Sequence, residues 1–223
     1  LNCGYSLDMY SNTIEGNRMV GVILQGAEWS YLSGNTIRDN AGDGFSIHEG
    51  DCSTSSDHNI LDWNTISGNG GAGGALRAGG PNAIYGAPIS GHGGKNIDNN
   101  TSGAGPLPND PGDTDGGPND QQNYPVINSV VHQNGNTVVE FTLDSMADFY
   151  EVQVYANPAF GQPAGKEYVS SDFFSVYGGP ITRSMVLEGL YDNLSLTATS
   201  DMYGGSEFSP MKAALAGPAV SVK

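Results

Sequence analysis

Four aspartates stand close together in TSGAGPLPNDPGDTDGGPNDQQNYP, a stretch without apolar periodicity that follows Asn100. The order Asp113-Thr-Asp115-Gly matches the start of a calcium loop, although the closing glutamate of such a loop is absent. Hard carboxylate oxygens on a flexible turn suit Ca²⁺. The segment is therefore predicted either to bind calcium or to be a solvated acidic linker. The candidate ligands are Asp110, Asp113, Asp115 and Asp120.

A second polar cluster lies in HEGDCSTSSDHN, where the chain has about six residues more than the related segments before and after it. Loops that project from a rigid scaffold commonly carry function. His and carboxylate side chains together can bind a transition metal or act as acid and base. The cluster has no recognised ligand spacing, so a polar surface loop is the alternative. The candidate residues are His48, Glu49, Asp51, Asp57 and His58.

Three aromatic residues are candidates for carbohydrate binding, because an aromatic face is a large apolar surface on which a sugar ring can stack. They are Trp29, Tyr31 and Trp63. Trp63 directly precedes a repeated Asn and lies near Leu61, which is predicted to point inward; Trp63 itself is expected to point outward. The alternative is that Trp63 packs under the inserted loop.

The two cysteines, Cys3 and Cys52, are 49 residues apart, which excludes a paired zinc-ligand motif. They are candidates for a disulfide in a secreted protein. Their phases in the repeat described next place them two coils apart, roughly 9 to 10 Å by strand spacing. A disulfide allows about 7 Å between Cα atoms, so this bridge requires a loop that reaches across.

The elements that hold these residues are predicted by a repeat. Asn-Thr-Ile occurs at Asn12, Asn35 and Asn64, spaced by 23 and 29 residues, and a degraded fourth copy puts Ala87 at the same position. A period of this length indicates a solenoid whose coils bury their apolar faces against one another. The residues two after each anchor are all Ile, and apolar residues alternate again ten and twelve positions after it, which predicts short strands with one face inward.

Two further positions of the repeat are predicted to be structural. Asn residues at the anchor and five positions later can form amide ladders between coils. His92, in Gly91-His92-Gly93, takes the second of these positions in the fourth copy. The glycines nine positions after each anchor, Gly21, Gly44 and Gly73, are expected to adopt a turn conformation forbidden to other residues.

The triplicated Asn-Thr-Ile pattern resembles right-handed parallel β-helices, a fold shared by secreted repeat proteins and by polysaccharide lyases and hydrolases. The Gly-His-Gly triplet resembles that of polygalacturonases, but the companion aspartates and the Arg-Ile-Lys of that family are absent, and no catalytic residue is predicted. The run from the last repeat through QNYPVI to LTATSDMYGGSEFSP resembles the C-terminal region of bacterial secreted β-helix proteins, which implies a terminal immunoglobulin-like module.

The predicted fold is therefore all-β: about four β-helix coils over residues 1–100, an acidic joint over 101–123, an antiparallel immunoglobulin-like sandwich over 124–210 and a tail over 211–223. Six or seven alternating apolar segments support the sandwich. A solenoid end needs a cover against edge-to-edge association, and residues 100 to 130 are expected to supply it.

Charge limits the partners. The 223 residues carry 24 acidic and 8 basic groups, a formal charge of −16, which disfavours binding to nucleic acid and anionic membranes. No apolar run is long enough to span a bilayer, and the first residues lack the features of a signal peptide. Because the start falls inside a repeat-like stretch, we expect the chain to be the C-terminal piece of a longer protein.

These observations predict a structural or adhesive module of a secreted or cell-surface bacterial protein, with proteins or glycans as partners. The alternatives are a fragment of a lyase or hydrolase that acts on acidic polysaccharide, and a subunit that self-assembles through its N-terminal coil. No cofactor other than calcium is predicted.

Overall fold

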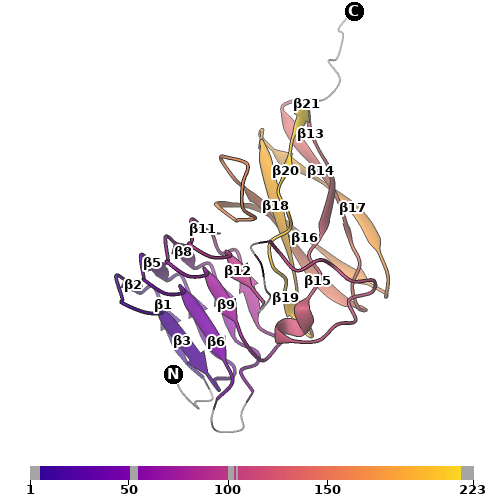
Figure 1. Cartoon of the computed structure of the whole chain (residues 1–223). Helices are drawn as coiled ribbons and strands as arrows, with labels where there is room; N and C mark the ends of the chain where they lie inside the picture. Colours follow the sequence, from indigo (N-terminus) through magenta and orange to yellow (C-terminus); the bar gives the residue numbers. More distant parts are fainter. Residues whose placement is uncertain (1–5, 51–54, 100–102, 104, 217–223) are drawn as a thin grey trace, which may run out of the picture.

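In the computed structural model, which describes residues 6–50, 55–99, 103 and 105–216, the chain forms a stack of parallel coils followed by an antiparallel sandwich (Figure 1). Each of four coils contributes three short strands. The strands are β1 (Asp8–Tyr10), β2 (Thr13–Glu15) and β3 (Val22–Gln25); β4 (Tyr31–Ser33), β5 (Thr36–Arg38) and β6 (Phe45–His48); β7 (Ile60–Asp62), β8 (Thr65–Ser67) and β9 (Gly74–Leu76); β10 (Ala83–Tyr85), β11 (Ile89–Ser90) and β12 (Ile97–Asp98).

The strand register confirms the alignment of the repeats. In the sheet β2-β5-β8-β11, the isoleucine of each coil pairs in register with the isoleucine of the next coil; these residues are Ile14, Ile37, Ile66 and Ile89. In the sheet β3-β6-β9-β12, Phe45 pairs with Gly74, and a Cβ added to Gly74 would lie 2.1 Å from the Phe45 ring. The glycine thus makes room for the large side chain of the coil before it.

A third sheet, β1-β4-β7-β10, lies before each anchor and was not assigned from the sequence. Its strands repeat no tripeptide, and each turns one residue inward: Met9, Leu32, Leu61 and Ile84. The residues on either side point outward and vary from coil to coil. The outward face of this sheet therefore carries side chains that the repeat pattern does not determine.

The predicted amide ladders are present. Asn12 and Asn35 donate through Nδ2 to Oδ1 of Asn35 and Asn64, at 3.1 and 2.9 Å. Asn17 and Asn40 bond in the same way to the next coil, and the ladder ends where the backbone N–H of Asn69 donates to Nδ1 of His92. His92 is thus a ladder residue, as its position predicts.

A third ladder has no counterpart among the predictions. The backbone N–H groups of Ser30, Asn59 and Asn82 donate to Oδ1 of the next member, at 2.9 to 3.1 Å. The last member is Asn119, which belongs to the short 3₁₀ element η1 (Pro118–Gln121) after the final coil. The acidic joint therefore continues the hydrogen bonding of the solenoid beyond its last strand.

The role expected of the glycines nine positions after each anchor is wrong. None of Gly21, Gly44 and Gly73 has a positive φ. An added Cβ at any of them would lie 2.5 Å from a backbone oxygen of the next coil. Close stacking of coils, rather than a special turn conformation, excludes a side chain there.

The second unit packs two sheets around its own core. One has the order β17-β14-β13-β21 and the other β16-β15-β18-β19, with β20 paired to β18. Two of these strands, β20 and β21, lie in the segment predicted as a tail. The strands are β13 (Val126–Gln133), β14 (Asn136–Leu143), β15 (Asp148–Ala156), β16 (Glu167–Val176), β17 (Ile181–Glu188), β18 (Asn193–Ser200), β19 (Gly204–Gly205), β20 (Lys212–Ala213) and β21 (Leu215–Ala216).

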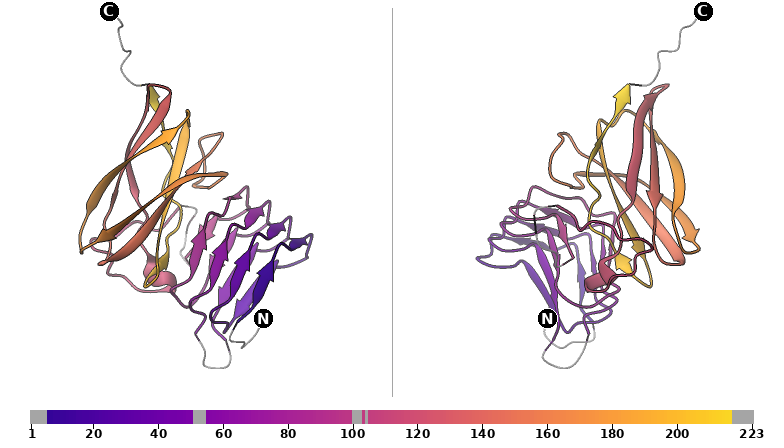
Figure 2. Two further views of the ribbon diagram at one scale, coloured as in Figure 1. Left: turned by 180° about the vertical axis from the view of Figure 1, so that it is seen from behind. Right: turned by 45° about the vertical axis from the view of Figure 1, so that its right-hand side comes forward.

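The sandwich stands against the last coil, at the end of the stack opposite the first coil (Figures 1 and 2). Tyr155 and Phe208 of the sandwich belong to the same apolar cluster as the solenoid core. Ile89 and Gly165 exchange two backbone hydrogen bonds, at 2.7 and 2.9 Å. The two units therefore share a core and a backbone pairing.

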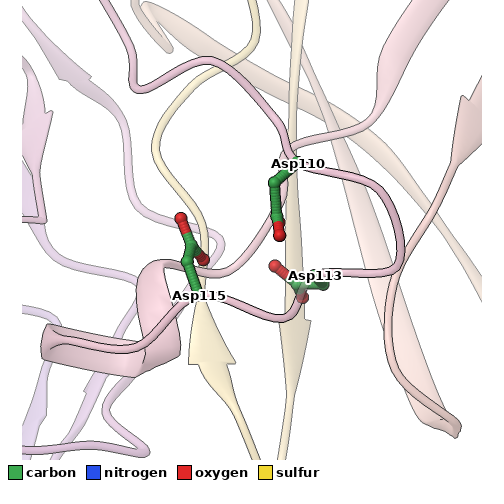
Figure 3. Close-up of side chains that lie close together, drawn as sticks. All are labelled: Asp110, Asp113 and Asp115. Atoms are coloured by element: carbon green, nitrogen blue, oxygen red, sulfur yellow. The ribbon is translucent and has the colours of Figure 1, made fainter.

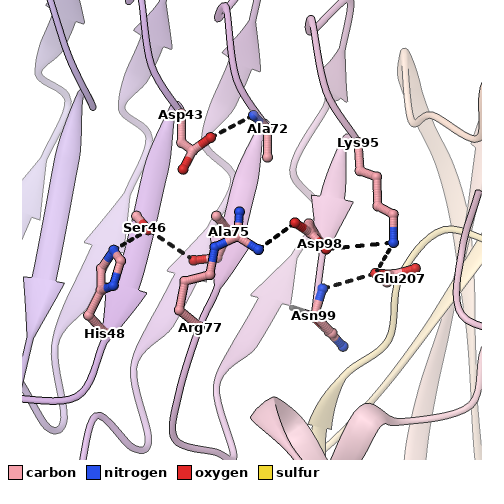
Figure 4. Close-up of polar contacts among 10 residues, drawn as sticks. All are labelled: Asp43, Ser46, His48, Ala72, Ala75, Arg77, Lys95, Asp98, Asn99 and Glu207. Atoms are coloured by element: carbon pink, nitrogen blue, oxygen red, sulfur yellow. Dashed lines mark hydrogen bonds and ion pairs between the residues drawn. The ribbon is translucent and has the colours of Figure 1, made fainter. Parts of the chain in front are cut away.

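A buried ionic network fastens the same joint (Figure 4). Glu207 accepts hydrogen bonds from Lys95 Nζ at 3.2 Å and from the backbone N–H of Asn99 at 2.9 Å. Lys95 also lies 3.6 Å from Asp98, which is paired with Arg77. The Lys95 and Glu207 side chains are only 8% and 4% exposed, so either charge alone would be costly.

Candidate functional site

Two adjoining cavities lie where the third solenoid sheet meets the sandwich sheet β16-β15-β18. Their volumes are about 320 and 420 Å³, and Tyr85, Ser200 and Asp201 line both. We refer to the two together as the groove. Its other principal lining residues are Asp62, Trp63, Phe149, Glu151, Tyr168 and Phe173 in the first cavity and Trp29 and His58 in the second.

Strand alternation positions the solenoid wall of the groove. Leu61 of β7 and Ile84 of β10 point into the core, which turns Asp62 and Tyr85 outward. Asp62 and Tyr85 are partners in register, so their side chains are neighbours on this face. The hydroxyl of Tyr31 donates to Asp62 at 2.7 Å, which fixes the carboxylate from the far side.

Trp63 leaves β7 at a turn position with φ of 51°, which Gly34 and Gly86 occupy in the neighbouring coils. Its ring lies over Gly86, where an added Cβ would come within 2.9 Å of the indole. Tyr168 meets it edge-on at 5.1 Å between ring centroids, and 56% of Trp63 remains exposed. Trp63 thus points outward, and its ring neighbour comes from the sandwich.

The other two aromatic candidates differ in position. Trp29 stacks on His58, with ring centroids 4.1 Å apart and an interplanar angle of 14°, and both line the second cavity. Tyr31 packs against Tyr10 and reaches the groove only through its bond to Asp62. The structure therefore brings Trp29 and Trp63 to one groove and places Tyr31 behind its wall.

The sandwich wall was missed entirely by the sequence-based prediction. Phe149, Glu151 and Gln153 alternate along β15 and share one face. Phe173 of β16 pairs in register with Glu151 and stacks with Phe149 at 6.3 Å. Phe149 and Phe173 are each more than half exposed and stack on one another, so they form a continuous apolar patch on this wall of the groove.

Tyr85 lies at the centre of a negative region. Burial raises the pKa of Tyr85, and the negative charges of Asp201, Glu151 and Asp62 raise it further. The Tyr85 phenol therefore stays protonated beside these carboxylates. No Lys or Arg stands among the described residues that line the groove.

A separate carboxylate cluster lies in the acidic joint (Figure 3). Asp110, Asp113 and Asp115 each offer an oxygen, and these oxygens lie within 4.8 Å of one another. Asp120, the fourth candidate, lies exposed in η1 and is outside this cluster. Three oxygens that converge in this way could form one side of a site for a hard cation.

Asp113 is the buried member of the cluster, only 1% exposed. It accepts hydrogen bonds from Ser145 Oγ at 2.6 Å and from the backbone N–H of Asn123 at 2.8 Å. Burial raises the pKa of Asp113 to about 6; the two hydrogen bonds oppose this shift, and the charges of Asp115 and Asp110 add to it. A cation at the cluster would offset both the burial and the repulsion.

The inserted loop forms no metal site among its described residues. His48 bonds to Ser46 through Nε2 at 2.7 Å, Asp57 accepts from the backbone N–H of Gly80, and His58 lies against Trp29. Glu49 is exposed. Asp51, Cys52 and Cys3 lie outside the described residues, so the disulfide stays a prediction.

The three stacked parallel sheets agree with the family that the sequence matches. Residues 1–178 match the family model described as right-handed β-helix region. The chain belongs to the right-handed β-helix family. The match continues beyond β12, the last parallel strand, into the antiparallel unit of this β-helix protein. No curated protein matches the chain. Among the described residues, no helix has the length and apolar character needed to cross a membrane.

Proposed function

We propose that this chain is a non-catalytic structural and adhesive module of a secreted or cell-surface bacterial β-helix protein, and that it binds glycans in the groove. The sandwich is, in this proposal, an immunoglobulin-like end module. The observation that carries the proposal is the convergence of exposed aromatic rings from both units, Trp63 from one side and Phe149 and Phe173 from the other, on a single groove. Aromatic anchors in a concave, pre-formed site are typical of ligand binding.

Screening the chain against an oligosaccharide array, followed by calorimetry on the hits, tests this function. Trp63→Ala is expected to weaken binding at least tenfold, because it removes the stacking platform while β7 and β10 stay paired in register. Tyr177→Ala is the matched control, since Tyr177 is a sandwich aromatic that is 88% exposed and lies outside the groove. Equal binding by both variants, with unchanged circular dichroism, would contradict the proposal.

We also propose that the joint cluster binds Ca²⁺, which would tie the joint to the sandwich through Asp113 and Ser145. Adding Ca²⁺ to chelator-treated protein is expected to raise the melting temperature of the native chain. It should leave Asp110→Asn with Asp115→Asn unchanged. An unchanged melting temperature of the native chain on adding EDTA and then excess Ca²⁺ would remove this part of the proposal.

Two other candidates have specific support. The carboxylates Asp62, Glu151 and Asp201 in the groove would suit a lyase or hydrolase, which a panel of polysaccharides, acidic ones included, tests through the release of reducing ends. The first coil, β1 to β3, is not stacked on another coil within the described residues, which would suit self-assembly. Light scattering over a hundredfold concentration range tests self-assembly, with Thr13→Lys on β2 as the disrupting variant.

A further inference from the structure

The charge of the groove restricts what it can hold. Asp62, Glu151 and Asp201 line it, and neither Lys nor Arg is found among its described lining residues. A concave site lined by one sign of charge focuses the potential and raises the local concentration of ions of the opposite sign. An acidic polysaccharide would be repelled from this groove, and a cationic ligand would be attracted to it.

The carboxylates are held in place from both walls. Tyr31 donates to Asp62 at 2.7 Å, and Gln153 Nε2 donates to Glu151 at 2.9 Å. Gln153 is itself held by the hydroxyl of Tyr155 at 2.6 Å and by the backbone N–H of Gly86 at 3.2 Å. Two of the three carboxylates are therefore oriented before any ligand arrives, which lowers the entropy lost on binding.

The aromatic rings stand beside these charges. Glu151 lies between Phe173 and Thr199 in register on adjacent strands, and Trp63 faces the same cavity from the solenoid. A ligand that fits must therefore present apolar ring faces and positive groups within a few ångströms of each other. A glycan of amino sugars has this combination on every residue.

The form of the walls favours a saccharide over a basic peptide. An extended peptide commonly binds by adding a strand to an exposed sheet edge. Here the lining side chains project from the faces of sheets, and the backbone near the groove is already paired: Asn82 accepts from Gly205, and Gly86 donates to Gln153. Side-chain stacking and ionic contacts remain for recognition.

We infer that the groove binds an oligosaccharide that carries protonated amino groups, with its rings on Trp63, Phe149 and Phe173 and its ammonium groups on Glu151, Asp201 and Asp62. This inference rests on the proposed function and adds the charge class of the glycan. The ammonium groups make charge-assisted hydrogen bonds, which are the stronger kind, to the carboxylates.

The test compares four probes at pH 6 by calorimetry: a β-1,4-linked glucosamine hexamer, its fully N-acetylated counterpart, a galacturonic acid hexamer and hexalysine. The glucosamine hexamer is expected to bind at least tenfold tighter than the N-acetylated one, and the galacturonic acid hexamer not at all. The variant Glu151→Gln with Asp201→Asn should reduce the preference below threefold. Glu188→Gln, an exposed carboxylate on β17, is the matched control.

Each other outcome has a distinct meaning. If the glucosamine hexamer and its N-acetylated counterpart bind equally well, and Trp63→Ala abolishes both, the glycan-binding function stands. The inference that the glycan carries positive charge is then overturned. Binding of no sugar on the array or among these probes would overturn both. Hexalysine binding that exceeds the glucosamine hexamer and depends on Trp63 would make the groove a peptide site and overturn the inference.

Discussion

At the scale of single residues, His92 is the weakest member of the ladder in which it stands. Its Nδ1 accepts from Asn69 at 3.1 Å, while its Nε2 is buried without a hydrogen-bond partner. Burial lowers the pKa of His92 to about 4. Because the unfolded chain takes up this proton more readily, the contribution of His92 is complete above about pH 6.5 and is lost as pH falls toward 4.

The change His92→Asn is therefore expected to stabilise the protein. Asn restores the amide found at Asn17, Asn40 and Asn69 and removes the titrating group. We expect a gain of about 1 kcal/mol at pH 7 from the restored hydrogen bonding and roughly 2 kcal/mol more at pH 5 from linkage. Urea unfolding at the two pH values measures it, with His48→Asn as control. A gain that does not depend on pH would contradict this account.

Asp113 has the opposite pH dependence. Its raised pKa means that the folded state holds the proton more tightly, so its contribution is complete below about pH 4 and is lost as pH rises through about 6. Asp110 and Asp115 face it, and Ser145 and Asn123 donate to it. At neutral pH without a cation, the carboxylate is a buried charge beside two others.

In chelator, Asp113→Asn is expected to be more favourable at pH 7 than at pH 4, by roughly 3 kcal/mol at most, since two pKa units correspond to that amount. Asn keeps an acceptor for Asn123 and can donate to Ser145. Thermal unfolding of both proteins at the two pH values gives the difference, and the contribution of His92 cancels because both proteins contain it. Calcium should reverse the order at pH 7. The same ranking at every pH and metal concentration would refute the assignment.

Spacing alone indicated an aspartate cluster in this turn-rich stretch, but it included Asp120 beside the three aspartates that converge, which lie within six positions of one another. The burial of Asp113 could not be predicted in this way. It depends on Ser145, which lies 32 residues later, beside Tyr150.

At the scale of elements, the ladders formed by strictly repeated residues could be predicted from the sequence, and the ladder formed by varying residues was not predicted. The Asn-Thr-Ile and five-residue spacings predicted two ladders and two strand rows, because identical residues must stack in register. The third ladder runs through Ser30, Asn59, Asn82 and Asn119. Its first three members lie five positions before the anchors, but Ser30 breaks the Asn pattern and Asn119 lies outside the coils.

Asn119 is expected to hold the joint on the last coil. Its Oδ1 accepts from the N–H of Asn82 at 2.9 Å, and its Nδ2 donates to the carbonyls of Asn82 and Gly205 at 2.7 and 3.0 Å. Asn119→Ala leaves the buried N–H of Asn82 unpaired, while the two carbonyls keep their bonds from the N–H of Gly205 and from Nδ2 of Asn99, so the cost is about 2 kcal/mol. Asn119→Asp keeps an acceptor for the N–H of Asn82. If this ladder bond makes the largest contribution, Asn119→Asp should lower the stability less than Asn119→Ala does.

Hydrogen exchange and urea unfolding check this prediction. Faster exchange is expected at Asn82 and at the amides of β10 and β19, with the β13–β14 hairpin unchanged. Asn128→Ala, which removes an exposed side-chain bond to Thr142, is the control. Unchanged exchange in β10 would show that the joint does not depend on Asn119.

At the scale of the whole molecule, the groove could not be predicted because its two walls are brought together only by the docking of the sandwich. Trp63 and Glu151 are far apart in sequence, and the outward face of each strand gives no sign of what it will face. The sequence did contain one usable signal, the alternation of Phe149, Glu151 and Gln153 on a strand with a large apolar residue at an exposed position.

The shared core leads to a prediction about cooperativity. Phe208 is 2% exposed and meets Tyr155 edge-on at 5.2 Å, and both rings belong to the solenoid core although they come from the sandwich. Unfolding the sandwich would therefore expose the last coil, while the buried Lys95–Glu207 pair would be broken at the same step. We expect one calorimetric transition for the whole chain, with a van't Hoff enthalpy equal to the calorimetric one.

Phe208→Ala should lower the stability of the chain by about 3 to 5 kcal/mol without splitting this transition into two. Phe141→Ala, in the core of the sandwich alone, should shift the same single transition. Two transitions, of which Phe141→Ala moves only one, would show instead that the solenoid folds without its cover.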